Sequence, residues 1–292
     1  MKLARALILW LLVCAMPCQA QTAAALRQKL AAIESSLQQT RFGQPLQLDS
    51  GESKSIAHGD IYAVMNYPFA TVSMALNNPE HWCDVMLLHI NTKYCHAQIT
   101  PADSRLRIYL GKKTPEPLSS ATRFDFRYSV LAANNEYLSI ALLAPTGPMG
   151  TSDYRITLEA VASGNGKTFL HLGYAWSSGF AGRLAMQTYL NTLGSGKVGF
   201  SLAEGGKAGK DGGKANYIGG IRGLAERNTM RYYLAIDSYL DTLNVAPADQ
   251  LDARLQRWYA AVERYPVQLH EVEREAYMSM KHDEHLRQQT LQ

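Results

Sequence analysis

The segments TRFDFRYSVLAANNEYLSIALLA (residues 122–144) and DYRITLEAVASGNGKTFLHLGYAWSS (residues 153–178) decide the fold. Apolar and polar residues alternate along them, as is typical of strands with one buried face. The predicted strands lie at residues 122–132, 136–144, 153–162 and 168–178. Between them, Asn-Asn at 134–135 and Gly-Asn-Gly at 164–166 are the clearest hairpin signals. Consecutive strands with short turns predict antiparallel hairpins in one strongly bent sheet.

The sequence before this region extends the same pattern. Strand-like runs at residues 53–65, 89–99 and 105–111 bring the predicted sheet to about seven strands. Two short helices are predicted between the first two of these runs, FATVSMAL (69–76) and PEHWCDVMLL (79–88). Leucine and isoleucine at helical spacing predict a further helix at residues 22–40, within an N-terminal segment ending near residue 45. The predicted fold class is α+β.

The last third of the chain has a helical pattern. An amphipathic helix is predicted at residues 183–193, followed by a glycine-rich loop at 194–220 that holds 10 glycines and a short hairpin between 197–202 and 216–220. Three more helices are predicted at residues 223–243, 247–265 and 266–289. Pro247 and Pro266 suit the first turns of the last two. Residues 221–292 therefore read as an all-α extension.

The first 20 residues resemble a secretory signal peptide. Lys2 and Arg5 precede an apolar run at residues 7–15, and small residues precede a cleavage point near Ala20. The run is shorter than the roughly 20 residues that a spanning helix needs, and a lipid-modified Cys18 is a weaker alternative because Met-Pro precedes it. We expect a secreted protein of the bacterial periplasm with no transmembrane segment in the mature chain.

Charge and composition exclude some partners. Removal of Lys2 and Arg5 lowers the 29 bases to 27, against 25 acids, so the mature chain is nearly neutral. A nearly neutral chain is a poor match for nucleic acid. The 47% hydrophobic composition allows a substantial core, in one large domain or two smaller ones.

The stretch HWCDVMLLHINTKYC (81–95) holds the two cysteines of the mature chain, Cys83 and Cys95. In an oxidising compartment an even pair of cysteines favours a disulfide. A metal site would need three or four ligands at characteristic spacings, and the nearby histidines do not supply them. A catalytic thiol would have to stay reduced outside the cytoplasm. We predict a disulfide and no metal site.

Strand alternation also predicts which side chains share a face. One face carries apolar side chains from three of the strands, and these are the candidate lining of a ligand cavity. They are Phe124, Phe126, Tyr128, Ile140, Tyr154, Ile156 and Leu158. The alternative is that they form an ordinary core, which is the more common fate of such residues.

Catalytic motifs are weak. No Gly-Lys pair has the spacing of a phosphate-binding loop, and neither a G-x-S-x-G nor an H-E-x-x-H motif occurs. His171, Arg127 and Glu159 are the polar side chains that could act as acid, base or orienting group if they point into a cavity. A structural histidine and solvated or paired charges are the alternative. We expect no cofactor.

Two segments resemble the START-like superfamily, also called SRPBCC, over roughly residues 53–193. IYAVMNYPFATVSMALNNPEHWCDVM (61–86) resembles its opening strand and two helices, and YRITLEAVASGNGKTFLHLGYAWSSGFAGRLAM (154–186) resembles its last hairpin and long helix. The resemblance implies a helix-grip fold, in which a curved sheet wraps a long helix and leaves a mostly apolar cavity. It places the START-like domain at residues 46–193.

The resemblance and the missing motifs together favour a non-catalytic protein that binds or transfers a hydrophobic or amphipathic small molecule, such as a lipid. Two alternatives stay open. One is a cyclase- or hydrolase-like enzyme that uses His171, Arg127 and Glu159. The other is a cell-envelope scaffold that binds a protein partner through its C-terminal helices.

Overall fold

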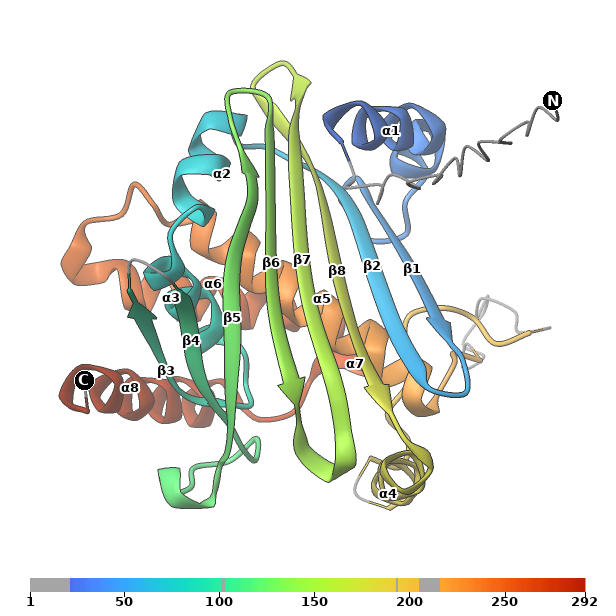
Figure 1. The fold of residues 1–292 in the computed structure, drawn as a ribbon, viewed down its shortest axis with the longest axis vertical. Coiled ribbons are helices and arrows are strands. Elements are labelled where there is room, and N and C mark those ends of the chain that lie inside the picture. The colour runs from blue at the N-terminus through green and yellow to red at the C-terminus, as the bar shows by residue number, and fades with distance from the viewer. Residues whose placement is uncertain (1–21, 101–102, 193, 205–215, 292) are drawn as a thin grey trace, which may run out of the picture.

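The computed structural model describes residues 22–100, 103–192, 194–204 and 216–291, which build one eight-stranded sheet with helices around it (Figure 1). The strand order is β1-β2-β8-β7-β6-β5-β4-β3, and every neighbouring pair is antiparallel. The strands are β1 (Leu46–Glu52), β2 (Ile56–Met65), β3 (Thr92–Ile99), β4 (Ser104–Leu110), β5 (Thr122–Ala133), β6 (Tyr137–Thr146), β7 (Thr151–Gly164) and β8 (Lys167–Ser178). The predicted α+β class with a curved antiparallel sheet is confirmed.

The sequence prediction missed strand β1. Its sequence LQLDSGE has two apolar residues, Leu46 and Leu48, and both are buried while the rest of the strand is more exposed. It lies at the edge of the sheet, where Leu48 pairs with Ile61 of β2. A short edge strand with so few apolar residues gives almost no alternating signal.

The two faces of the sheet are covered differently. The concave face packs against α2 (Phe69–Leu76), α3 (Pro79–Leu88) and α5 (Gly220–Asp241), and Figure 1 shows α5 running behind the central strands. The convex face is covered at one end by α1 (Ala23–Gln38), which packs on β7 and contributes to a smaller apolar cluster. The predicted helices at 69–76 and 79–88 have the same bounds as α2 and α3.

The helix held by the sheet is α5, and the expectation that residues 183–193 supply it is wrong. Helix α4 (Phe180–Asn191) lies at the end of β8, and its Phe180 and Leu184 are exposed. Helix α5 instead contacts β1, β2 and β8, and 16 of its 22 residues are buried. Helix α5 is therefore part of the helix-grip core, although its residues lie in the segment predicted to be an extension.

A close approach between β2 and α5 depends on Gly59. A Cβ atom built on Gly59 would lie 2.4 Å from the Oγ1 atom of Thr229 and 3.3 Å from the carbonyl oxygen of Ala225. The first distance is too short for a Cβ atom, and the second is a tight contact. A glycine at this position of β2 allows the helix backbone to come close to the sheet.

The remaining C-terminal helices join the same core. They are α6 (Gln250–Val262), α7 (Pro266–Leu269) and α8 (Arg274–Thr290), so the helix predicted at 266–289 is divided in two. Trp258 of α6 stacks on Tyr277 of α8 with ring centroids 4.9 Å apart, and both rings belong to the main core cluster that contains the sheet. Together with α1, these helices confirm the predicted helical termini.

The disulfide between Cys83 and Cys95 is present, and it joins α3 to β3 with a Cα–Cα distance of 5.2 Å. The predicted signal peptide at residues 1–20 and most of the glycine-rich loop, residues 205–215, lie outside the described residues. At the ends of that loop Leu202 and Tyr217 form an antiparallel bridge, as the predicted short hairpin requires. Among the helices of the described ranges, none has the length and apolar composition needed to cross a bilayer.

Candidate functional site

The concave face carries a continuous cluster of aromatic rings, which we call the aromatic cluster. Its members are Phe124, Phe126, Tyr154, Tyr174, Trp176 and Tyr232. Phe124 stacks on Phe126 at 5.9 Å between centroids and meets the edge of Tyr154 at 5.3 Å. Five of the rings come from β5, β7 and β8, and the sixth comes from α5 on the opposite side of the core. The cluster therefore spans the interface between the sheet and the helix.

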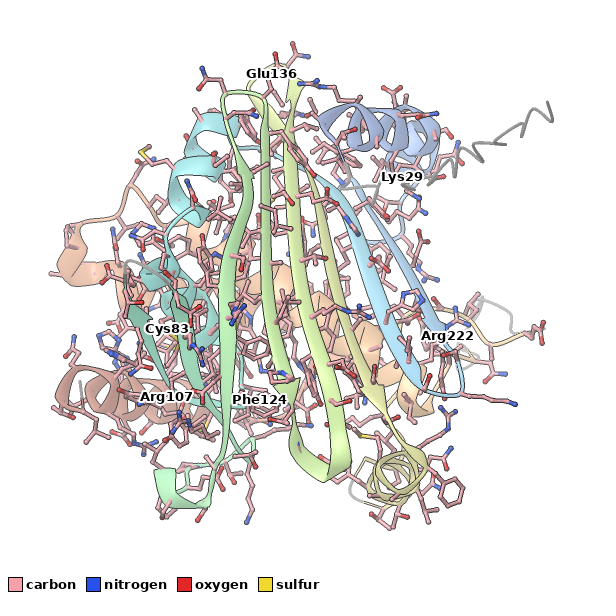
Figure 2. All side chains as sticks on the ribbon, in the orientation of Figure 1. Lys29, Cys83, Arg107, Phe124, Glu136 and Arg222 are labelled. Carbon is pink, nitrogen blue, oxygen red and sulfur yellow. A yellow bond between two sulfur atoms is a disulfide. The ribbon has the colours of Figure 1, made fainter. Side chains whose placement is uncertain are left out.

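The seven side chains predicted to line a cavity all lie on this concave face. Each is buried and belongs to the main core cluster: Phe124, Phe126, Tyr128, Ile140, Tyr154, Ile156 and Leu158. In Figure 2, Phe124 is labelled near the first residues of β5, among side chains that fill the space in front of the helices. Their shared face agrees with strand alternation, and their role as a ligand lining stays a prediction.

The tyrosines of the aromatic cluster bring hydroxyl groups into this apolar region. Burial raises the pKa of Tyr154, Tyr174 and Tyr232 above the ordinary value. Their hydroxyls therefore stay protonated at neutral and moderately alkaline pH. The Tyr154 hydroxyl lies 2.9 Å from the Thr151 hydroxyl.

His171 and Glu159 lie together, but on the convex face rather than the concave one. The Nδ1 atom of His171 is 3.0 Å from Glu159 Oε2, and its Nε2 atom is 2.9 Å from Asp60 Oδ1. The imidazole also stacks on the ring of Tyr62 at 4.4 Å between centroids, and Tyr137 donates its hydroxyl to Glu159. Strands β2, β7 and β8 position these groups side by side.

The electrostatics of His171 favour a structural role. Burial alone would lower the pKa of His171, but the hydrogen bonds to Asp60 and Glu159 outweigh it and raise that pKa above the ordinary value. Burial would raise the pKa of Asp60, but its hydrogen bonds with His171 and His58 hold that pKa below its usual value. Because both ring nitrogens face carboxylates, neither is available to exchange a proton with a substrate.

Arg127 is separated from the other two polar candidates. Its side chain is 62% exposed on the convex face, where its Nε atom lies 3.6 Å from Asp103 Oδ1. It borders an open recess of about 430 Å³ together with Arg105 and Arg155. The structure therefore does not bring His171, Arg127 and Glu159 together as one site.

A second recess, of about 360 Å³, lies between the end of β2 and helices α5 and α6. Burial raises the pKa of Asp237 in its wall, and the nearby Asp241 adds to this effect. The Tyr67 hydroxyl donates to Asp237 at 3.3 Å, and Arg257 pairs with Asp241 at 2.9 Å. These polar groups are hydrogen-bonded or ion-paired with one another, so we interpret the recess as a polar surface rather than a binding site. Within the described residues, no group of three or more His, Cys, Asp or Glu side chains is arranged to hold a metal ion.

Sequence reasoning missed three members of the aromatic cluster. Strand alternation along β8 places Tyr174 and Trp176 on the face opposite His171, but the predicted cavity lining does not include them. Tyr232 gives no such signal, because it lies on α5 and reaches the cluster only through the packing of that helix on the sheet.

No protein-family model and no curated protein matches this sequence. Among solved structures, the Zhui aromatase/cyclase from Streptomyces sp. R1128 is 12% identical, with a TM-score of 0.32 over 71% of this chain and 96% of that one. Human StAR-related lipid transfer protein 5 is 12% identical, with a TM-score of 0.29 over 55% and 86% of the two chains. The conserved protein of unknown function EF2215 from Enterococcus faecalis is 8% identical, with a TM-score of 0.33 over 89% and 99%. Similarity at this level carries no argument about function, and the helix-grip assignment rests on the strand order and on the placement of α5.

Proposed function

We propose that this chain is a secreted, periplasmic START-like protein that binds or transfers a hydrophobic or amphipathic small molecule without catalysing a reaction. The observation that carries this proposal is the aromatic cluster between the concave face and α5. Flat ring faces suit an aromatic or lipid-like ligand, whose binding is driven by removal of apolar surface from water, at about 25 cal/mol per Å². The ligand replaces ring–ring contacts with ring–ligand contacts between sheet and helix.

The Cys83–Cys95 disulfide supports the secreted part of the proposal. Disulfides persist in oxidising compartments such as the bacterial periplasm and are rare in the cytosol. The signal-like pattern of residues 1–20 points the same way. Intact-mass spectrometry of the protein isolated from periplasm tests this directly. The expected mass is that of a chain beginning after Ala20, less two hydrogens for the disulfide.

Binding is tested with N-phenyl-1-naphthylamine, a neutral apolar probe that becomes fluorescent when it leaves water. We expect Phe126→Ala and Tyr154→Ala each to raise its Kd about ten-fold, the factor that 1.4 kcal/mol of lost contact produces. The matched control is Phe180→Ala, since Phe180 is 88% exposed on α4. Unchanged affinity in both concave-face variants, or an equal loss in the control, would contradict the proposal.

The two alternatives have less support. For an enzyme, His171 has both ring nitrogens occupied by carboxylates, and Arg127 borders a different region. For an envelope scaffold, α5 is largely buried, and α6 and α8 have exposed faces but direct the large side chains Trp258 and Tyr277 into the core. Neither alternative is favoured by an observation of its own.

A further inference from the structure

A group of mostly basic side chains adjoins the aromatic cluster, and we call it the cationic cluster. It consists of four basic side chains near Glu271, which are Arg227, Arg231, Lys113 and Lys197, together with the neutral ring of His89 beside Arg231. Arg227 and Arg231 lie one turn apart on α5 and are 3% and 2% exposed. Lys113 and Lys197 are about one-third exposed, so they form the rim of the cluster.

Positive charge is in excess here. Glu271 accepts ion pairs from three cations, with distances of 2.6 Å from Arg231, 2.6 Å from Lys113 and 3.2 Å from Lys197. Arg227 is the fourth cation, and no carboxylate of the described residues lies within ion-pair distance of it. Glu226 is nearby, but its oxygens accept hydrogen bonds from Ser50, Phe200 and Ser201. Four basic side chains therefore face two carboxylates.

Three buried donors of the cluster lack an acceptor in the part of the chain that the structure describes. They are Arg227 Nη1, Arg231 Nε and His89 Nε2. The Nδ1 atom of His89 accepts the Asn91 backbone N–H at 3.3 Å, which leaves Nε2 as the protonated nitrogen of a neutral ring. Burial and the neighbouring Arg231 keep the pKa of His89 well below its ordinary value, so the ring stays neutral. Buried donors normally have acceptors, so the cluster is complementary to a group rich in oxygen and negative charge.

The cationic and aromatic clusters are continuous. The ring of His89 stacks on that of Tyr232 at 4.8 Å between centroids, and Tyr232 lies 5.4 Å from Tyr174. Arg231 and Tyr232 are consecutive on α5. One bound molecule can therefore contact both clusters at once.

We infer that the ligand is an anionic amphiphile, with a carboxylate or phosphate monoester head in the cationic cluster and an apolar body against the aromatic cluster. This inference rests on the proposed function, since it names the class of ligand that the concave face binds. Arg227 and His89 donate to the head group, and the rim lysines attract it by charge.

The test compares two probes of equal chain length, dodecanoate and dodecanol, by calorimetric titration of the delipidated mature protein at pH 7.5. We expect dodecanoate to bind about ten-fold more tightly than dodecanol, because charge-assisted hydrogen bonds form with the carboxylate alone. In Arg227→Met, the Kd of dodecanoate should rise to about that of dodecanol, while the Kd of dodecanol stays unchanged. Arg227 takes part in no ion pair of the described residues, so its removal unpairs no carboxylate there and the variant should fold. If Arg227→Met does not fold, Lys113→Met at the rim takes its place. We then expect a smaller loss of the preference for dodecanoate over dodecanol.

The matched control is Arg155→Met, which removes an exposed arginine of β7 and should leave both affinities unchanged. Equal affinity for the two probes in the wild type, or an undiminished preference in Arg227→Met, overturns the inference while leaving the proposed function intact. Binding of inorganic phosphate alone without competition against dodecanoate also overturns it, because the cluster would then be a separate anion site. If neither amphiphile binds, the proposed function itself fails and the inference fails with it.

Discussion

Replacing Glu284 by glutamine should destabilise the protein by about 3–5 kcal/mol, because two buried lysines share this one carboxylate. Lys93 lies 2.9 Å from Glu284 Oε1 and Lys281 lies 2.7 Å from Oε2. Both lysine side chains are 0% exposed, and Glu284 is 3% exposed. These contacts attach helix α8 to strand β3.

The magnitude follows from the protonation of Lys281. Burial lowers its pKa from 10.5 to about 8, even though Glu284 opposes the shift. This burial already costs the wild type about 3 kcal/mol at pH 7, at 1.36 kcal/mol for each tenfold change in the proton equilibrium. With a neutral glutamine in place of Glu284, Lys281 would lose the carboxylate that opposes this lowering of its pKa, and Lys93 would lose its ion pair as well. Removing one partner of a buried ion pair costs about 3–5 kcal/mol, because the remaining charge is left uncompensated, and here two lysines lose the same partner.

Urea denaturation at pH 7, with the disulfide intact and intrinsic fluorescence as the signal, measures this difference. Lys281→Met should cost less than Glu284→Gln, because it leaves one lysine for one carboxylate. The double variant should cost less than the two single changes added together. Asp283→Asn, an exposed neighbour on the same helix, is the matched control and should stay within about 0.5 kcal/mol of the wild type. A cost below about 1 kcal/mol for Glu284→Gln, or simple additivity, would refute the reasoning.

Three further predictions concern other parts of the fold. Folding raises the pKa of His171, so its ion pairs stabilise the protein fully below the unfolded pKa of about 6.5, and this stabilisation is lost as the pH rises through the folded pKa. The urea midpoint of His171→Gln should therefore vary less with pH than that of the wild type. Equal pH dependence of the two midpoints would contradict the raised pKa of His171. Replacing Cys83 and Cys95 by alanine should cost about 3 kcal/mol, since the disulfide closes a short loop, and wild-type denaturation with and without reductant supplies the comparison. Gly59→Ala should lower the free energy of unfolding by about 1–3 kcal/mol, because the added Cβ would clash with α5. Gly179→Ala is the control and should leave this free energy unchanged, because its Cβ would meet open space. Similar stability of the two variants would contradict the close approach of β2 and α5.

Local signals were sufficient for most of the strands and for two of the helices. Helix α3 begins where the sequence predicts because the Asn78 side chain accepts the Glu80 backbone N–H at 2.9 Å and Pro79 occupies the first turn. Strand alternation also placed Phe124 and Tyr154 on one face of the sheet. In each case, the residues that determine the element are close together in the sequence.

The identity of the helix held by the sheet could not be predicted in this way. Helix α5 carries Glu226, Arg227 and Arg231 at positions that the fold buries, and ionised residues in a helix normally indicate a solvent-exposed face. The groups that compensate two of these charges are distant in the sequence: Ser50 for Glu226, and Glu271 for Arg231. Tertiary contacts of this kind are absent from any local pattern, so the sequence favours the shorter amphipathic helix at 183–193.

The buried lysines around Glu284 and the cationic cluster differ in a way that separates support of the fold from ligand binding. A lysine ammonium has three donors, and Lys281 uses all three, on the His89 and Thr92 carbonyl oxygens and on Glu284. Lys93 is also saturated, through the Thr114 carbonyl, Met280 Sδ and Glu284. A network completed in this way needs no further molecule.

In the cationic cluster, by contrast, some buried donors have no acceptor among the described residues. Arg227 makes no hydrogen bond there, and Arg231 and His89 each retain a buried donor without an acceptor. An unsatisfied buried donor is expensive to maintain, at about 1–3 kcal/mol each, and a folded chain tolerates the cost more readily where a bound group satisfies the donors for part of the time. One of the open donors, Nε2 of His89, belongs to a ring that stacks on Tyr232 of the aromatic cluster. This location is the physical reason for expecting the protein to gain stability on binding an anionic amphiphile, and a Tm that rises with dodecanoate but much less with dodecanol would be its thermal signature.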